Sequence, residues 1–224
     1  MRIKKNKFVA FTLAEVLLTL GIIGIVAEMT IPTLVNNINN SQYVSGLKKG
    51  MSEFSSAINL IMSDNGGTLV NLFANNNDLL DTVCTKLVCS KKCHSSDTQD
   101  CFHNGYVSKI NGTNINFPVD FSSIGGVSGI LSDGSSFFIS NFDSTCNSNG
   151  IQLCFVISID VNGVKTPNKM GRDVFEYYVE QQGVKLAGHE YPHATDYCDP
   201  TLSSITYNGM SCGLRVFQEG GMNY

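Results

Sequence analysis

Residues 11–35, which read FTLAEVLLTLGIIGIVAEMTIPTLV, constrain the rest of the chain more than any other stretch. A helix of about 20 apolar residues is long enough to cross the hydrocarbon core of a bilayer, which is roughly 30 Å thick. The two charges inside this stretch are Glu15 and Glu28. An acid in a membrane-length helix needs a partner, so Glu15 is expected to be functional, whereas Glu28 lies near the far end and is expected to be solvated at the interface.

The ten residues before this stretch form a basic leader, MRIKKNKFVA, with four cations and no acid. A short basic leader followed by an apolar segment is typical of export, and the positive-inside rule keeps the leader in the cytoplasm. A conventional signal peptide has a small-residue cleavage site after its apolar region. Residues 36–40 read NNINN and offer no such site, and the small residue is instead Ala10, ahead of the apolar stretch.

The run AFTLAE that begins at Ala10 resembles the processing site of type IV pilins and type II secretion pseudopilins. In that family a membrane peptidase cuts ahead of the phenylalanine and N-methylates it, which implies cleavage after Ala10 and methylation of Phe11. Most members have glycine where this chain has Ala10. Gly21, Gly24 and Pro32 look like the family's recurrent small residues and the proline that kinks its N-terminal helix.

The resemblance also implies a role for Glu15 in assembly, and physical chemistry supports it. Cleavage would leave a positive α-amino group at Phe11, at the positive end of a helix dipole and in lipid. A carboxylate four residues further on can neutralise that amine within the chain or in a neighbouring subunit. In a packed filament this pairing would set the axial register; the alternative is that Glu15 is solvated at the membrane surface.

The overall composition fits an anchored domain that lies outside the cytoplasm. The chain has 224 residues, of which 42% are hydrophobic, enough for one ordinary globular domain beyond the helix. Its formal net charge is −4, and loss of the leader would make it more negative. Nucleic acid is therefore not expected as a main partner.

Eight cysteines follow the export segment, so disulfides in an oxidising compartment are expected. Proximity favours pairing Cys146 with Cys154 and Cys198 with Cys212. The other four would then pair among themselves, and they are Cys84, Cys89, Cys93 and Cys101. The alternative for these four is a zinc site that includes His94 and His103, but their spacing contains no C-x2-C knuckle.

A helical pattern resumes after the asparagine-rich residues. Apolar residues recur at intervals of three and four and share one face of a helix: Val44, Leu47, Met51, Phe54, Ile58 and Ile61. Residues 64–67, DNGG, provide a stop signal. One helix is thus predicted from about Thr12 to about Ser63, and its second half needs a sheet to cover its apolar face. A coiled coil is the alternative, but the stripe spans fewer than three heptads.

Downstream of this helix the pattern changes to strands. Residues 68–116 are interpreted as an irregular insertion tied by disulfides. A hairpin is predicted from residues 129–132 and 135–141 around an Asp-Gly turn, and residues 153–159 suit a buried central strand. Shorter strands are expected at 175–179 and 184–187, and residues 211–217 are expected to close the sheet.

These elements predict an α+β fold, in which a long N-terminal helix packs on a small antiparallel sheet as in pilins. The predicted organisation is a leader (1–10), a transmembrane or filament-core helix (11–35) and an extracytoplasmic globular domain (36–224). That domain would comprise an amphipathic helix (36–64), the cysteine-rich insertion (68–116), and the sheet with its C-terminal loops (117–224).

The loop from Asp160 to Asp173 resembles one that ends in Gly-x-Asp before an aromatic strand in many pseudopilins, where a loop in this region binds calcium. By that resemblance the calcium ligands would be Asp160, Asn162, Asn168 and Asp173, which offer the hard oxygens that Ca²⁺ prefers. The alternative is a plain turn, because Asn-Gly and Pro-Asn favour turns and Asx side chains satisfy local backbone groups without metal.

An enzymatic function is not expected. The run HEYPH at residues 189–193 has the letters of the helix-borne H-E-x-x-H zinc motif. Pro192 does not suit a helix interior, and the flanking residues are typical of a loop. No nucleophile elbow or phosphate-binding glycine loop is found in the sequence.

The expected function is structural. After cleavage by a prepilin peptidase, the subunit would leave the inner membrane for a filament of a type IV pilus or a type II secretion machine. Its partners there would be copies of itself or other pilins. Before assembly it would be a single-pass protein with a cytoplasmic N-terminus. The alternative is a binding domain tethered by residues 1–35 that never polymerises, with the cysteine-rich region as its recognition surface.

Overall fold

The structure is a computed structural model, and it describes residues 11–103, 107–115, 125–140, 142–147, 152–189, 197–202 and 208–224. The chain divides into two compact units, Met1–Asn39 and Asn40–Tyr224. The sequence-based boundary between the helical anchor and the globular domain, at residues 35 and 36, lies four residues ahead of this division.

The long N-terminal helix is present: α1 runs over Leu13–Asp64. It ends where predicted, because Gly66 and Gly67 have positive φ angles of 74° and 85° and the Gly67 amide donates to the Met62 carbonyl at 2.7 Å. Pro32 lies inside this helix. Among the described residues, α1 is the one helix long and apolar enough to cross a membrane.

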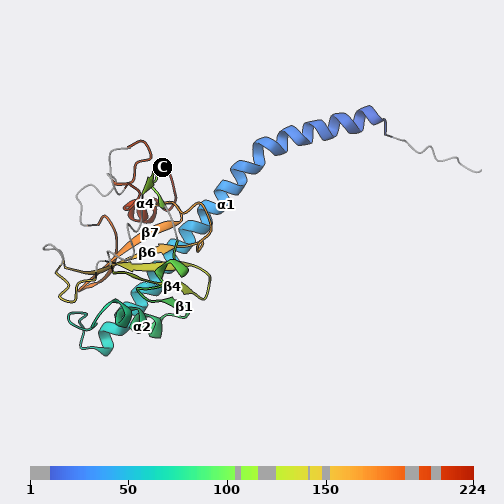
Figure 1. The fold of residues 1–224 in the computed structure, drawn as a ribbon. Coiled ribbons are helices and arrows are strands. Elements are labelled where there is room, and N and C mark those ends of the chain that lie inside the picture. The colour runs from blue at the N-terminus through green and yellow to red at the C-terminus, as the bar shows by residue number, and fades with distance from the viewer. Residues whose placement is uncertain are drawn as a thin grey trace, which may run out of the picture. The chain divides into compact units, whose positions relative to one another are not determined.

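Six strands form one antiparallel sheet in the order β1-β4-β5-β6-β7-β8. Their bounds are Cys89–Cys93 (β1), Val127–Leu131 (β4), Ser136–Ser140 (β5), Leu153–Asp160 (β6), Val174–Glu180 (β7) and Gly183–Leu186 (β8). A separate pair joins β2 (Val107–Ser108) to β3 (Asn114–Ile115). The sheet and α1, drawn in Figure 1, confirm the α+β class.

The predicted hairpin of β4 and β5 is confirmed, and its turn chemistry explains why it forms. Gly134 has a φ of 89°, a conformation that favours glycine. The Asp133 carboxylate accepts hydrogen bonds from the backbone amide and the hydroxyl of Ser135, which closes the turn locally. The predicted strands at β6, β7 and β8 are also present.

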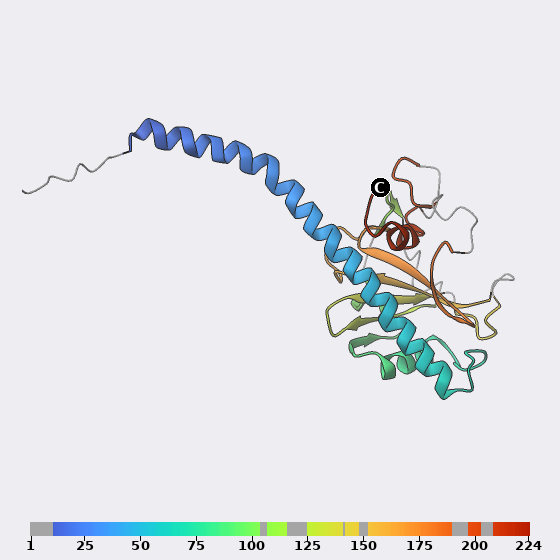
Figure 2. The same cartoon turned by 180° about the vertical axis from the view of Figure 1, so that it is seen from behind.

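The second half of α1 packs on one face of the sheet, as Figure 2 shows. Leu47, Phe54, Ile58 and Ile61 are fully buried there, which confirms the predicted apolar stripe. Burying each such side chain contributes about 1.5–3 kcal/mol. Gly50 allows the close approach of helix and sheet, because a Cβ at that position would lie 2.7 Å from the Cδ1 atom of Ile159.

The opposite face of the sheet is covered as well. Phe138 and Val174 pack there with Phe102, Val107 and Met170 in a second apolar cluster. All eight residues of β6 are therefore buried. A strand buried on both faces has a continuous apolar run instead of alternating polar and apolar residues, which is the pattern of residues 153–159.

One predicted strand is wrong. Residues 211–217 do not close the sheet, because α4 (Cys212–Glu219) is a helix there. Gly213 lies against Leu47 and Phe175, and Val216 is fully buried, so the segment packs on the sheet face already occupied by α1. Gly220, with a φ of 71°, ends this helix.

Residues 68–116 are more regular than predicted. They contain α2 (Asn76–Lys86), β1, a 3₁₀ turn (η1, Thr98–Asp100) and the β2–β3 pair. The Asn75 side chain caps α2 by accepting hydrogen bonds from the amides of Asn77 and Asp78. Since β1 pairs with β4, this segment is not only an insertion but also supplies one edge of the main sheet.

Candidate functional site

The first predicted site is the junction at the start of α1. Ala10, the predicted cleavage residue, lies outside the described residues. Phe11 is 84% exposed, and Thr12 directly precedes the helix. Glu15 folds back on Thr12: its Oε2 atom accepts from the Thr12 amide and from the Thr12 hydroxyl, each at 2.8 Å.

Thr12 and Glu15 together form a capping box. In return for the two bonds that Glu15 accepts, its amide donates to the Thr12 hydroxyl oxygen at 3.2 Å. This reciprocal arrangement satisfies backbone amides that the first turn of a helix leaves without partners. Sequence reasoning did not assign Thr12 a role, although the spacing T-x-x-E is the signature of this motif. Glu15 thus has a local structural role besides the assembly role expected for it.

The surface of α1 in the first unit, together with Phe11 just before it, is mainly apolar, and its two charged residues are Glu15 and Glu28. The large apolar side chains there are all more than 40% exposed: Phe11, Leu13, Val16, Leu17, Leu18, Leu20, Ile22, Ile23, Ile25, Val26, Met29, Ile31, Leu34, Val35 and Ile38. Soluble monomers seldom expose contiguous apolar patches larger than a few hundred Å². This surface therefore requires an apolar environment, which either lipid or other helices can provide.

The cysteines form four disulfides, and every cysteine takes part. The pairs are Cys84–Cys89, Cys93–Cys101, Cys146–Cys154 and Cys198–Cys212. The two predicted pairs and the pairing of the remaining four among themselves are thereby confirmed. Their thiols are consumed in these bonds, so the zinc alternative is wrong. His94 instead lies 3.3 Å from Asp81 on the surface.

The structure brings the four predicted calcium ligands into one loop between β6 and β7. Asp173 is fully buried at its centre. Its carboxylate accepts hydrogen bonds from the amide of Lys169 at 2.6 Å and the amide of Asn168 at 2.9 Å, and from the Asn162 side-chain nitrogen at 3.1 Å. Burial nonetheless raises the pKa of Asp173 above its ordinary value.

Asp160, at the end of β6, is also fully buried, and its partner comes from another part of the chain. The Nε2 atom of His103 lies 2.9 Å from the Asp160 Oδ2 atom, and His103 is itself 95% buried. The other oxygen of Asp160 accepts from the Asn162 amide at 3.1 Å. Burial raises the pKa of Asp160 to about 6, with His103 acting to lower it and the negative charge of Asp173 to raise it.

These contacts bear on the predicted calcium site. Ca²⁺ takes six to eight oxygen ligands. Here each carboxylate oxygen of Asp160 and Asp173 already faces a nitrogen. Within the described residues, no group of three or more His, Cys, Asp or Glu side chains is placed to hold a metal ion. The bonds from the amides of Asn162, Asn168 and Lys169 fit the plain-turn alternative. One oxygen each of Asp160 (Oδ2), Asn162 (Oδ1) and Asn168 (Oδ1) is buried without a hydrogen-bond partner among the described residues, so the calcium site stays a prediction.

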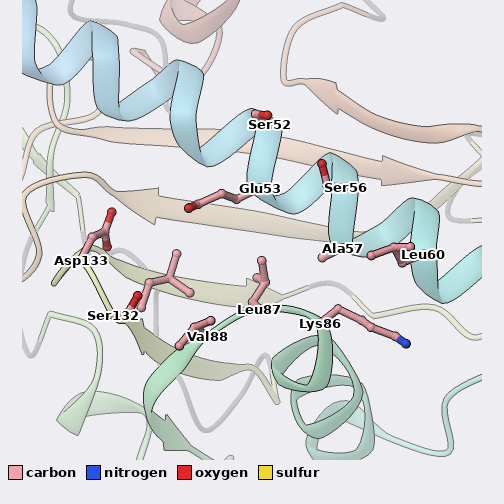
Figure 3. Close-up of a pocket in the computed structure, with 11 residues that line it drawn as sticks. Ser52, Glu53, Ser56, Ala57, Leu60, Lys86, Leu87, Val88, Ser132 and Asp133 are labelled. Carbon is pink, nitrogen blue, oxygen red and sulfur yellow. The ribbon is translucent and has the colours of Figure 1, made fainter.

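A shallow groove lies between α1, the end of α2 and the β4–β5 turn, with a volume of about 270 Å³. Figure 3 shows Glu53 and Asp133 toward one end and Lys86 toward the other, with Ala57 and Leu87 between them. These charged side chains are engaged nearby: Lys49 pairs with Glu53 and Asp133, and Lys86 pairs with Asp64. We assign no ligand to this groove.

His189 is the one residue of the H-E-x-x-H run that the structure describes, and it does not lie in a helix. His189 lies in a turn after β8, where its Nε2 atom is 2.7 Å from an oxygen of Glu180 and its Nδ1 atom is 2.9 Å from the Leu186 carbonyl. Glu190 and His193 lie outside the described residues. His189 is thus a partly buried side chain held in a turn by the buried Glu180.

The geometry thus provides an exposed apolar helix with a capped N-terminus and a disulfide-tied globular unit. Comparison with known protein families, with curated proteins and with solved structures finds no match. Any functional assignment for this chain therefore rests on its own residues and their arrangement.

Proposed function

We propose that this chain is a structural subunit of a filament of the type IV pilus or type II secretion class, made as a membrane-anchored precursor. Cleavage after Ala10 would produce a mature chain that begins at Phe11. Copies of the mature subunit, or copies mixed with related subunits, would then leave the membrane and pack into a helical filament.

The observation that carries this proposal is the exposed apolar surface of α1 in the first unit. A membrane tether needs an apolar surface of about 20 residues and nothing more. Here the helix that carries this surface continues into a second half, which belongs to the core of the globular unit. A helix of this design can exchange lipid for neighbouring helices, because lipid tails and apolar side chains offer similar surroundings.

The junction sequence supports the same proposal. A tether that is never processed needs no small residue just ahead of its apolar stretch, and the capping bonds from Thr12 leave the charge of Glu15 without a positive partner. An acid near the start of a membrane segment is costly unless it meets a positive partner. The α-amino group created at Phe11 by cleavage would be such a partner for Glu15.

The direct test is intact mass spectrometry and N-terminal sequencing of the protein, isolated from membranes with and without a prepilin peptidase. The proposal predicts a chain that begins at N-methylated Phe11 when the peptidase is present and at Met1 when it is absent. An Ala10→Glu variant, with a large charged residue at the cleavage position, serves as the matched control and should keep its leader. A wild-type chain that still begins at Met1 in the presence of the peptidase would contradict the proposal and favour the tethered binding domain.

A further inference from the structure

Two fully buried carboxylates flank the loop between β6 and β7: Asp160, the last residue of β6, and Asp173, which directly precedes β7. Buried carboxylates are costly unless they are paired or well hydrogen-bonded. The question is therefore which groups of this chain compensate them.

Asp173 is compensated from within the loop. Its two oxygens accept from the amides of Asn168 and Lys169 and from the side chain of Asn162. Asn168 adopts a φ of 51°, a left-handed conformation that asparagine tolerates better than most residues. The loop is thus folded around this carboxylate by its own N–H groups.

Asp160 is compensated from outside the loop. The loop itself supplies one amide, from Asn162, and the remaining oxygen faces His103 at 2.9 Å. His103 lies two residues after Cys101, whose disulfide to Cys93 links it to the edge strand β1. Its neighbour Phe102 is fully buried in the second apolar cluster, so the backbone that carries the imidazole is fixed by packing.

We infer that the imidazole of His103 stands in for a bound cation at this loop, so that the loop is ordered without metal. His103 occupies the side of Asp160 from which a cation would otherwise coordinate Oδ2. The 2.9 Å approach of His103 Nε2 to Asp160 Oδ2 is an ion-pair contact and not an aligned hydrogen bond. Oδ1 of Asn162 and Oδ1 of Asn168 are also buried without a hydrogen-bond partner in the described part of the structure. Removal of the imidazole would leave Oδ2 of Asp160 with no nitrogen facing it, and we expect a divalent cation such as Ca²⁺ to take that place.

The test is thermal unfolding of the full-length protein in detergent, in EDTA and in millimolar Ca²⁺. Wild type should unfold at the same temperature in both. His103→Ala should unfold at least about 5 °C lower in EDTA, because Asp160 loses a buried partner, and Ca²⁺ should recover part of that loss. If His103→Ala does not fold in EDTA, the recovery is measured as the yield of folded protein on adding Ca²⁺.

Two variants separate this role from general packing. His103→Gln keeps a side-chain N–H near Asp160, so it should lose less stability than His103→Ala and stay insensitive to Ca²⁺. His94→Ala removes a histidine that faces Asp81 on the surface, where both side chains are more than 40% exposed, and should have little effect.

Three results would overturn the inference. The first is a wild-type unfolding temperature that rises with Ca²⁺. The second is a His103→Ala variant no less stable than His94→Ala. The third is a His103→Ala variant that loses stability but does not respond to Ca²⁺.

A second readout is the emission of bound terbium excited through tyrosine. The Tyr43 hydroxyl lies 3.5 Å from the Asn162 side chain, close enough to excite an ion bound at this loop. The emission should appear only with His103→Ala.

Discussion

The hydroxyl of Tyr177 donates a hydrogen bond to the backbone carbonyl of Leu47 at 2.8 Å, which joins β7 to the second half of α1 inside the core. Both side chains are fully buried. Burial raises the pKa of Tyr177 far above its ordinary value, so the hydroxyl keeps its proton and remains a donor. This bond fixes the position of the helix along the sheet, which apolar packing alone specifies less sharply.

Replacing Tyr177 with phenylalanine should lower the free energy of unfolding by about 1 kcal/mol, because one buried hydrogen bond is lost while the ring is kept. For a domain of this size the unfolding temperature should fall by roughly 2–4 °C, measured by circular dichroism. Tyr177→Leu should cost more, since it also removes ring contacts with Phe54. Equal stability of Tyr177→Phe and wild type would show that the hydroxyl contributes nothing net.

Replacing Gly50 with alanine should destabilise the globular unit by about 1–3 kcal/mol. The added Cβ would lie 2.7 Å from the Cδ1 atom of Ile159 and 2.9 Å from the Tyr177 hydroxyl oxygen. This overpacking should outweigh the gain of about 1 kcal/mol that alanine brings to a helix interior. Gly24→Ala in the same helix is the control, because nothing lies within 4 Å of its Cβ and no loss is expected. Urea unfolding of both variants measures the difference.

The sequence predicted the fold where a local pattern and the packing agree. The α1 stripe, the glycines that end the helix and the Asp-Gly turn between β4 and β5 each combine periodicity with a clear stop or turn signal. The pattern failed at residues 211–217, where a short apolar run is compatible with a strand or a helix and the packing of Gly213 against Leu47 and Phe175 decides for helix.

The candidate site residues, too, could be predicted only where a local sequence pattern specified them. Cysteine proximity was sufficient to pair Cys146 with Cys154, because the two lie only eight positions apart. The contact between His103 and Asp160 spans more than fifty residues and depends on how a disulfide-tied segment folds over the sheet, which no local signal encodes. Thr12, in contrast, could have been found, because T-x-x-E before an apolar run is readable in the sequence.

The stability of the protein should depend on the ionisation of Asp160. Its pKa is about 6 in the folded protein, above the ordinary value of 3.8, so the folded state binds a proton more tightly than the unfolded chain does. The contribution of Asp160 to the free energy of unfolding should therefore rise by about 1 kcal/mol as the pH falls from about 7 to about 5. When the pH is raised again through about 6, this contribution should disappear. Denaturant unfolding across this range should show the rise in wild type and a smaller one in Asp160→Asn. Identical pH profiles for the two proteins would contradict the raised pKa.

The four disulfides should differ in their contribution to stability. Cys198–Cys212 closes a loop with a sequence separation of 14, and Cys84–Cys89 closes one with a separation of 5. A longer loop loses more unfolded-state entropy on cross-linking, so removing the first pair should cost about 3 kcal/mol and the second about 2. Cys198 and Cys212 are also fully buried. Paired alanine variants compared by thermal unfolding test this order, and a larger loss from the Cys84 and Cys89 pair would reverse it.

The two roles of Glu15, capping its own helix and neutralising the Phe11 amine, can be separated by paired substitutions. Glu15→Ala removes both the carboxylate charge and the bonds to Thr12. Glu15→Gln keeps a side-chain oxygen that can accept from the Thr12 amide, so it preserves the cap but not the charge. If charge neutralisation drives assembly, both variants should insert into the membrane, yet filament yield should fall strongly in both.

The measurement is filament yield by shearing and immunoblotting, with membrane insertion checked by fractionation. Thr12→Val is the reciprocal control, because it removes the hydroxyl of the capping box and leaves the Glu15 charge in place. Loss of that cap should cost about 1 kcal/mol at one helix end, so assembly should persist. Assembly that survives in Glu15→Gln but fails in Thr12→Val would assign Glu15 to capping and contradict its proposed pairing with the amine.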